Sequence, residues 1–252
     1  MRSLLATVNL LRGIGHLFHG MWTIATRFSD ANTAQRSEHI AKWSRGLLRL
    51  LNVTIATQGQ PVQHGPMMVV LNHISWLDIL VLLAAQPVCF VSKAEIKHWP
   101  LIGWLATQVG TLYIERASRR DAMRVVHQIA DGLRAGQLIA VFPEGTTSDG
   151  SRVLPFHANL LQAAISAGCP VQPVALKFLE QNSQRSMSPV YIDDDTLLSS
   201  VWRMLKANPV TASLDFLPPV ASQGQDRRAL AAQLQTQITA RINPDISPPQ
   251  DS

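Results

Sequence analysis

The 252-residue sequence has little cysteine, little charge and no long run of uncharged apolar residues. Its two cysteines, Cys89 and Cys169, are too few for a disulfide framework or a zinc pattern, so we expect buried free thiols in a reducing compartment. A charged fraction of 15% beside a hydrophobic fraction of 46% excludes a disordered or acidic-tail protein. The composition suits one globular enzyme domain with more apolar surface than usual.

Excess positive charge is absent from most of the chain. Residues 1–52 carry seven basic and two acidic side chains, whereas residues 53–252 carry 15 of each, so the net charge of +5 belongs to the N-terminal segment. A nucleic-acid-binding protein more often has a basic face on its folded domain, so no nucleic-acid partner is expected. An anionic membrane surface matches a basic N-terminal segment better.

Two amphipathic helices are predicted in residues 1–52. Residues 4–28 are mostly apolar, but the longest uncharged stretch has 14 residues, fewer than the ~20 that a transmembrane helix needs. The second helix, over residues 34–51, has basic residues on one side and apolar residues on another. Such helices can lie in a membrane surface with their apolar sides down, or they can cap the protein core in water. The excess positive charge of residues 1–52 favours the first alternative, so this segment is predicted to associate with the membrane. The polar stripe of the first helix consists of Asn9, Arg12, His16, His19, Thr23 and Arg27.

Residues 53–243 alternate short apolar runs with longer stretches of helical periodicity. This alternation predicts an α/β domain with a largely parallel sheet flanked by helices. Residues 244–252 contain three prolines and are predicted to form a flexible tail. Strands are predicted at 67–71, 88–92, 111–115, 138–142, 171–177, 189–192 and 211–216, and helices at 76–85, 101–108, 119–135, 157–167, 195–207 and 229–242.

His73 follows closely on the predicted strand 67–71, where loops of α/β proteins carry reactive groups. Ser75 is a candidate N-cap of the next helix, which would put Asp78 at its N3 position and bring the carboxylate back toward the loop. An aspartate that accepts a hydrogen bond from one imidazole nitrogen leaves the other nitrogen to act as a base near neutral pH. His73 is therefore a candidate general base, although a His and an Asp five residues apart, taken alone, favour purely structural roles.

Later segments add polar groups at the ends of further predicted strands. One strand ends with Arg116, another is followed by Glu144 and the flexible Gly145, and residues 171–175 form a further buried strand. These strand ends could all face one cleft. A serine hydrolase would need a Gly-x-Ser-x-Gly nucleophile motif, which the sequence lacks. A non-catalytic membrane-binding module would explain the N-terminal helices but not polar blocks at successive strand ends.

These blocks, in this order and spacing, resemble the glycerophospholipid acyltransferase family, whose bacterial members include the lysophosphatidic acid acyltransferases. The first block of the family is Asn-His-four residues-Asp, and its third is Phe-Pro-Glu-Gly-Thr. The resemblance spans roughly residues 53–216. The four blocks are matched at Asn72–Asp78, Gly110–Arg116, Phe142–Thr146 and Val171–Val174.

The resemblance implies an O-acyltransferase at the cytoplasmic face of the inner membrane. It would move a fatty acyl group from acyl-CoA or acyl carrier protein to the free sn-2 hydroxyl of 1-acyl-glycerol-3-phosphate, making phosphatidic acid. His73 would be the general base and Asp78 its orienting partner, with no covalent acyl-enzyme, no metal and no cofactor beyond the thioester co-substrate. The implied acceptor-binding residues are Arg116 on the phosphate, Glu144 holding the glycerol or shaping the site, Gly145 as a candidate oxyanion donor, Thr146 and Thr147.

The third block departs from the family pattern at Thr147, where the family usually has an arginine thought to help bind phosphate. Arg116 could compensate for this missing cation, as could the cluster Arg119, Arg120 and Arg124, whose alternative role is a solvated helix face. Otherwise the acceptor is not a phosphate monoester. A threonine here also resembles family members that acylate lyso-ornithine lipid, an amino-acid lipid without phosphate. Both acceptors stay open.

Overall fold

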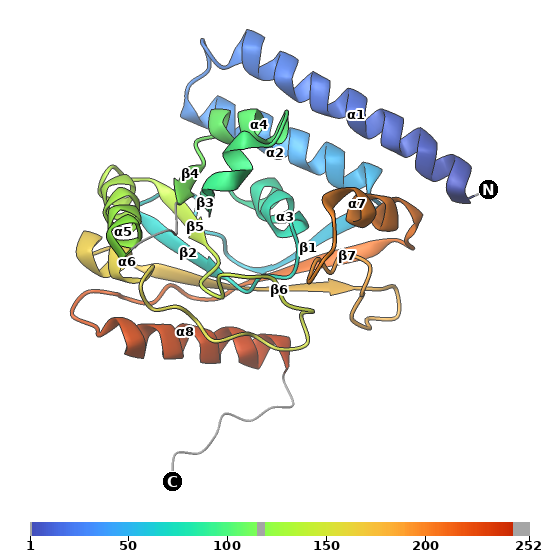
Figure 1. Cartoon of the computed structure of the whole chain (residues 1–252). Coiled ribbons are helices and arrows are strands. Elements are labelled where there is room, and N and C mark those ends of the chain that lie inside the picture. The colour runs from blue at the N-terminus through green and yellow to red at the C-terminus, as the bar shows by residue number, and fades with distance from the viewer. Residues whose placement is uncertain (1, 115–118, 244–252) are drawn as a thin grey trace.

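A seven-stranded sheet forms the centre of the molecule (Figure 1). The computed structural model describes residues 2–114 and 119–243, so Arg116 and the predicted tail 244–252 lie outside it. The strand order is β1-β7-β6-β2-β5-β3-β4, and all neighbouring pairs are parallel except β6 with β7. The predicted α/β class with a largely parallel sheet is confirmed. The strands are β1 Val53–Gly59, β2 Met67–Leu71, β3 Cys89–Lys93, β4 Leu112–Ile114, β5 Leu138–Val141, β6 Val171–Leu179 and β7 Val210–Phe216.

Helices cover both faces of this sheet. Figure 1 shows α3 directly over one face, with α2 and then α1 further out, and α8 along the opposite face. None of the described helices is both long and apolar enough to cross a membrane. The helices are α1 Arg2–Arg27, α2 Thr33–Leu50, α3 Leu77–Ala85, α4 Ile102–Gln108, α5 Arg119–Arg134, α6 Gln162–Ala167, α7 Leu197–Lys206 and α8 Arg227–Ile242, with a 3₁₀ helix at Ala94–His98.

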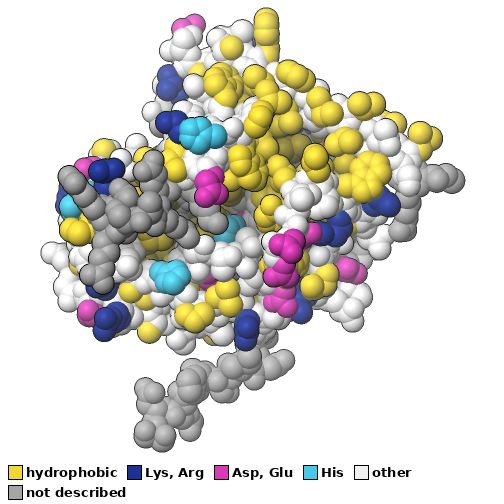
Figure 2. Space-filling view, in the orientation of Figure 1, with side chains coloured by type: hydrophobic (Ala, Val, Ile, Leu, Met, Phe, Trp, Pro, Cys, Tyr) yellow, Lys and Arg dark blue, Asp and Glu magenta, His cyan; other side chains and the backbone are white. Residues whose placement is uncertain are grey.

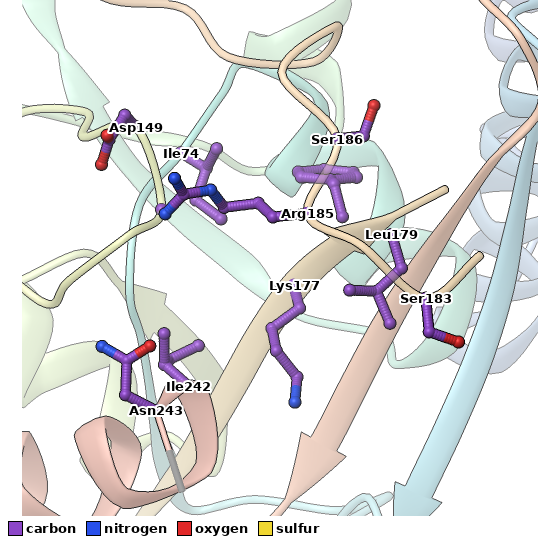
Figure 3. Close-up of a pocket in the computed structure, with 11 residues that line it drawn as sticks. Ile74, Asp149, Lys177, Leu179, Ser183, Arg185, Ser186, Ile242 and Asn243 are labelled. Carbon is purple, nitrogen blue, oxygen red and sulfur yellow. The ribbon is translucent and has the colours of Figure 1, made fainter. Parts of the chain in front are cut away.

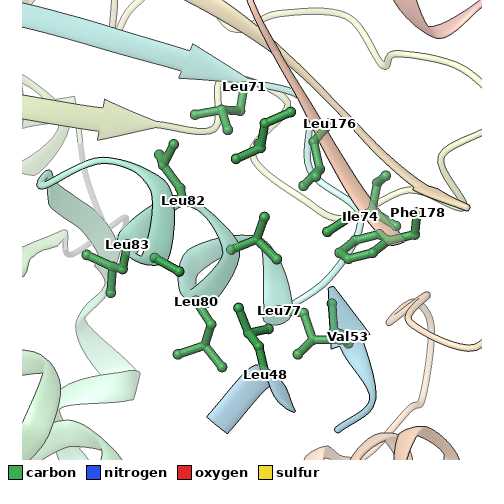
Figure 4. Close-up of a cluster of buried hydrophobic side chains, with 14 of the residues drawn as sticks. Leu48, Val53, Leu71, Ile74, Leu77, Leu80, Leu82, Leu83, Leu176 and Phe178 are labelled. Atoms are coloured by element: carbon green, nitrogen blue, oxygen red, sulfur yellow. The ribbon is translucent and has the colours of Figure 1, made fainter. Parts of the chain in front are cut away.

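The core has one apolar layer on each face of the sheet. Every residue of β2 is buried, and its side chains alternate between the layer beneath α3 and the layer beneath α8. A strand that is covered on both faces reads as a continuous apolar run, which is why the sequence predicts β2 so well. Figure 4 shows Leu48 of α2 among Leu77, Leu80 and Val53 in the first layer, so α2 is packed into the core beside β1. The predicted boundary at residue 52, between the N-terminal helices and the α/β domain, stays a prediction.

The predicted helix 157–167 begins only at Gln162, the 3₁₀ helix Ala94–His98 was not predicted, and two strands differ from the prediction. The strand expected at 189–192 is wrong, because its backbone groups bond elsewhere: the Tyr191 N–H donates to Ile74 O, and Arg203 of α7 donates to the carbonyl of Val190. Strand β1 was not predicted, because it is an edge strand with only Val53 buried and most of its other residues exposed. Of the two thiols, Cys169 is buried and Cys89 is half-buried.

Candidate active site

His73 and Asp78 lie together just beyond the C-terminal end of β2. His73 Nδ1 is 2.7 Å from Asp78 Oδ2, within hydrogen-bond distance. The Asp78 side chain is fully buried, whereas the His73 side chain keeps 19% of its surface exposed. Because Nδ1 donates its hydrogen bond to the Asp78 carboxylate, Nε2 is the ring nitrogen that can receive a proton from a bound substrate.

The Asp78 carboxylate also holds the loop that carries His73. Its Oδ2 accepts hydrogen bonds from the backbone N–H groups of Ile74 at 2.7 Å and Ser75 at 2.9 Å. The predicted return of Asp78 toward His73 is therefore present, but the expected capping box is only half formed. Helix α3 begins at Leu77, and the Ser75 hydroxyl accepts from the Leu77 N–H at 3.3 Å instead of from the Asp78 N–H. One carboxylate oxygen thus fixes both the ring and the backbone beside it.

Glu144, at the end of β5, supports His73 from the other side. Its Oε1 accepts from the His73 N–H at 2.7 Å and its Oε2 accepts from the Leu154 N–H at 2.8 Å. Burial raises the pKa of Glu144 to about 7, although the two N–H donors favour its charged form and limit that rise. Both carboxylate oxygens are engaged with the backbone. This favours the predicted role of shaping the site over the role of holding glycerol.

Phe142 is a site residue to which sequence reasoning assigned no function. Its ring stacks on the His73 imidazole with 4.0 Å between ring centroids, and Phe90 stacks behind it at 5.8 Å. The stack covers one face of the imidazole and so limits its rotation. The signal available in the sequence was the aromatic residue that opens the third block, directly before Pro143 and Glu144.

Asn72 received no role from the sequence either, although it opens the first block. It is buried, and its side-chain amide donates to Leu176 O at 3.0 Å and accepts from the Leu176 N–H at 2.8 Å. These two bonds continue the pairing of β2 with β6 beyond the end of β2. Asn72 therefore fixes the point from which the His73 loop leaves the sheet.

Residues 145–148, at the end of the third block, form a turn beside the His73 loop. The Gly145 N–H donates to Phe142 O at 3.1 Å, and its role as an oxyanion donor stays a prediction. Gly145 has a φ of 72°, in the left-handed region that favours glycine, and this conformation makes the turn. Thr146 is exposed, and the Thr147 hydroxyl donates to the carbonyl of Tyr191. The Ser148 N–H donates to His73 O at 2.8 Å and ties this turn to the first block.

Comparison with known proteins agrees with this geometry. Residues 52–177, which contain His73, Asp78 and Glu144, match the family model described as Acyltransferase. The chain belongs to the acyltransferase family. The predicted family and enzyme class are thereby confirmed.

Two curated relatives of this acyltransferase carry different acceptor names. The chain is 35% identical to the lyso-ornithine lipid O-acyltransferase of Pseudomonas aeruginosa, over 99% of this chain and 97% of that protein. It is also 35% identical to the 1-acyl-sn-glycerol-3-phosphate acyltransferase of Neisseria meningitidis, over 83% of each. The solved 1-acyl-sn-glycerophosphate acyltransferase of Thermotoga maritima superposes with a TM-score of 0.73 over 100% of both chains, at 20% identity. That structure supports the fold.

The cations predicted for a substrate phosphate remain untested in this acyltransferase. Arg116 lies outside the described residues, as do the side chains of Arg119 and Arg120. Arg124 lies on α5. The structure therefore brings together His73, Asp78, Glu144 and the turn through Thr147, and it leaves the predicted phosphate contacts as predictions. Within the described part of the chain, no cluster of three or more His, Cys, Asp or Glu side chains is arranged to hold a metal ion.

Proposed function

We propose that this acyltransferase moves a fatty acyl group from a thioester, on coenzyme A or acyl carrier protein, to the free hydroxyl of a lysolipid. The hydrogen-bonded pair of His73 and the buried Asp78 carries this proposal. His73 Nε2 removes the hydroxyl proton as the lysolipid oxygen attacks the thioester carbonyl carbon. The C–S bond then breaks, and the imidazolium returns the proton to the departing thiolate.

The environment of the pair suits this chemistry. A buried carboxylate on Nδ1 stabilises the imidazolium that forms at Nε2 during the transfer. The stacked Phe142 and the hydrogen bond that the His73 N–H donates to the Glu144 carboxylate hold His73 in one orientation before the substrate arrives. General-base catalysis of this kind accelerates a reaction by about 10²–10⁴-fold. Positioning of the two substrates supplies further acceleration.

For the acceptor, the first candidate is 1-acyl-glycerol-3-phosphate, whose acylation at the sn-2 hydroxyl gives phosphatidic acid for phospholipid synthesis. The second candidate is lyso-ornithine lipid, and one observation favours it. Thr147 stands where the resembled family usually has an arginine, and its hydroxyl is bonded to Tyr191 O instead of facing a ligand. The Pseudomonas aeruginosa relative, which aligns with 99% of this chain, is named for the lyso-ornithine acceptor.

The transfer is tested with purified full-length protein, labelled acyl-CoA or acyl carrier protein, and each of the two lysolipids. We expect a labelled diacyl product and one free thiol released for each acyl group transferred. Thiol release without a labelled lipid product would mean that the enzyme hydrolyses thioesters. That result would overturn the proposed transfer.

Attachment to a membrane surface is the second part of the proposal. Helix α1 turns a row of apolar side chains outward: Leu4, Leu11 and Trp22 are 71%, 64% and 69% exposed. Figure 2 shows hydrophobic side chains gathered over the part of the surface that contains α1. From the polar stripe, His16 instead faces α2, where its Nε2 donates to Trp43 O at 2.8 Å. A helix that exposes its apolar side and binds the protein through a polar residue fits the surface of an anionic membrane at the cytoplasmic face.

The membrane proposal needs point substitutions, because deleting residues 1–52 would also remove Leu48 from the core. Leu11→Glu combined with Trp22→Glu should weaken binding to anionic lipid vesicles at least tenfold, since each buried apolar side chain contributes about 1.5–3 kcal/mol. Gln58→Glu combined with Gln181→Glu adds the same charge at exposed positions outside α1 and serves as the control. Equal vesicle binding by the two double variants would contradict the proposal.

A further inference from the structure

A cavity borders Ile74, the residue next to the proposed base His73. This cavity of about 240 Å³ opens between the end of β6, the loop at Asp149 and the C-terminal end of α8. Ile74, the residue directly after His73, forms part of its wall (Figure 3). Arg185 and Asp149 approach this cavity from two different segments of the chain. The cavity therefore borders the loop that carries His73.

Two charged groups of opposite sign at this cavity have free hydrogen-bonding capacity. The Arg185 guanidinium makes no hydrogen bond or ion pair with another described residue, although its charge acts on Asp149. The Asp149 carboxylate accepts two hydrogen bonds from Ser151, at 2.8 and 2.6 Å, and both reach Oδ1. Its Oδ2 accepts none from the described residues. Figure 3 shows the Arg185 side chain extended across the cavity over Ile74.

The other cation of the cavity already has a role in the fold. Lys177 Nζ donates to Arg241 O at 3.0 Å and so satisfies a carbonyl at the C-terminal end of α8. The hydrogen bonds from Ser151 are the largest cause that lowers the pKa of Asp149, so its carboxylate is ionised at neutral pH. Lys177 keeps its charge and two further N–H donors, so the charged groups that can meet a ligand are the cations Arg185 and Lys177 and the free carboxylate oxygen of Asp149.

This charge pattern discriminates between head groups. A phosphate monoester would pair with Arg185 and Lys177, but it would be repelled by the negative Asp149 and would leave that carboxylate oxygen without a partner among the described residues. A head group with only an ammonium group would meet Arg185 and Lys177. A head group that carries a carboxylate and an ammonium group can place its carboxylate on the cations and its ammonium group on Asp149.

We propose that this cavity is the head-group subsite for the acceptor and takes a zwitterionic amino-acid head group. Arg185 binds its carboxylate and Asp149 binds its ammonium group, while the acyl chain with the reacting hydroxyl runs past Ile74 to His73. This inference rests on the proposed acyl transfer to a lysolipid and deepens it. It narrows the acceptor to an amino-acid lysolipid such as lyso-ornithine lipid.

The test compares three acceptors with purified full-length enzyme and labelled acyl-CoA: lyso-ornithine lipid, the same lipid with its side-chain amine acetylated, and 1-acyl-glycerol-3-phosphate. Arg185→Met should raise KM for lyso-ornithine lipid about tenfold and leave kcat within about twofold, because it removes one charge-assisted contact. In the wild type, the acetylated lipid should have a KM about tenfold above that of the free amine. Asp149→Asn should abolish this difference, since the asparagine keeps an oxygen for Ser151 but has no charge.

The matched control is Arg228→Met, an exposed cation at the opposite end of α8, which should change neither KM nor kcat. An unchanged KM for lyso-ornithine lipid in Arg185→Met would overturn the subsite. Wild-type enzyme that acylates only 1-acyl-glycerol-3-phosphate would also overturn it, and in both cases the proposed acyl transfer would stand. Absence of transfer to all three acceptors would instead overturn the proposed function.

Discussion

Asp78→Asn separates the electrostatic role of the buried carboxylate from its structural role. Asp78 Oδ2 contacts three donors, and an asparagine oxygen can still accept from the Ile74 and Ser75 N–H groups. Asp78 Oδ1 has no hydrogen-bond partner, so an amide NH₂ at that place breaks no bond among the described residues. The loop therefore keeps its conformation, while His73 loses the charge that stabilises its protonated form and fixes its tautomer.

The expected loss of kcat/KM in Asp78→Asn is about 10²–10⁴-fold, which is the range for general-base catalysis. In free energy this is about 2.7–5.5 kcal/mol of transition-state stabilisation. The unfolding free energy should fall by at most about 3 kcal/mol, because the substitution weakens hydrogen bonds to a charged group without removing the acceptor. Activity should thus fall far more than stability.

The assay measures acyl transfer at saturating and limiting lysolipid, with urea unfolding of the same preparations. Asp131→Asn is the control, because that aspartate is 73% exposed and pairs with Arg134 on the surface. The control should lose neither activity nor more than about 1 kcal/mol of stability. A folded Asp78→Asn enzyme with kcat/KM within about threefold of the wild type would refute the role given to Asp78.

Three further predictions concern groups around the pair. Burial raises the pKa of Glu144 from 4.5 to about 7, so between these pH values the folded protein keeps a proton that the unfolded chain releases. The unfolding free energy should therefore fall by up to about 3 kcal/mol as the pH rises from 4.5 to 7. Glu144→Gln should remove this fall in urea unfolding at the two pH values, and an identical pH dependence in both proteins would contradict it. Arg203 donates to Ser188 O at 3.0 Å and pairs with Asp195 at 2.8 Å, so Arg203→Met should lower the unfolding free energy by about 1–3 kcal/mol, with partial rescue in Arg203→Lys. Urea unfolding of Arg203→Met that matches the wild type would contradict this. Phe178 is only 1% exposed, so Phe178→Ala should lower the unfolding free energy by about 3–5 kcal/mol. A loss below about 1 kcal/mol in urea unfolding would contradict the tight packing of this core layer.

Local pattern was sufficient to predict the elements that position the site. Strand β2 is an uninterrupted apolar run, and α3 follows it after a short polar loop, so sequence alone located His73 and Asp78 at the end of a buried strand. The return of Asp78 to the loop follows from helix geometry over three residues. These features depend on neighbours in the sequence.

The parts that sequence did not predict depend on distant contacts. The bond between Glu144 and the His73 N–H joins residues 71 positions apart, and no local pattern gives the direction of that carboxylate. The stacking of Phe142 on His73 depends on β5 lying beside β2. Residues 189–192 read as a strand because Val190 and Ile192 are β-branched and Tyr191 is aromatic. Arg203 and Ile74 nevertheless satisfy backbone groups that a strand would need for pairing.

In the proposed mechanism, His73 is the base that activates the lysolipid hydroxyl. The most direct test is the rate of acyl transfer from a labelled thioester to lysolipid by His73→Ala, measured beside the wild type on protein whose fold is verified by circular dichroism. We expect a loss of at least about 10²-fold with the fold intact, since the Asp78 carboxylate keeps its two backbone donors. Full activity in folded His73→Ala would contradict the mechanism.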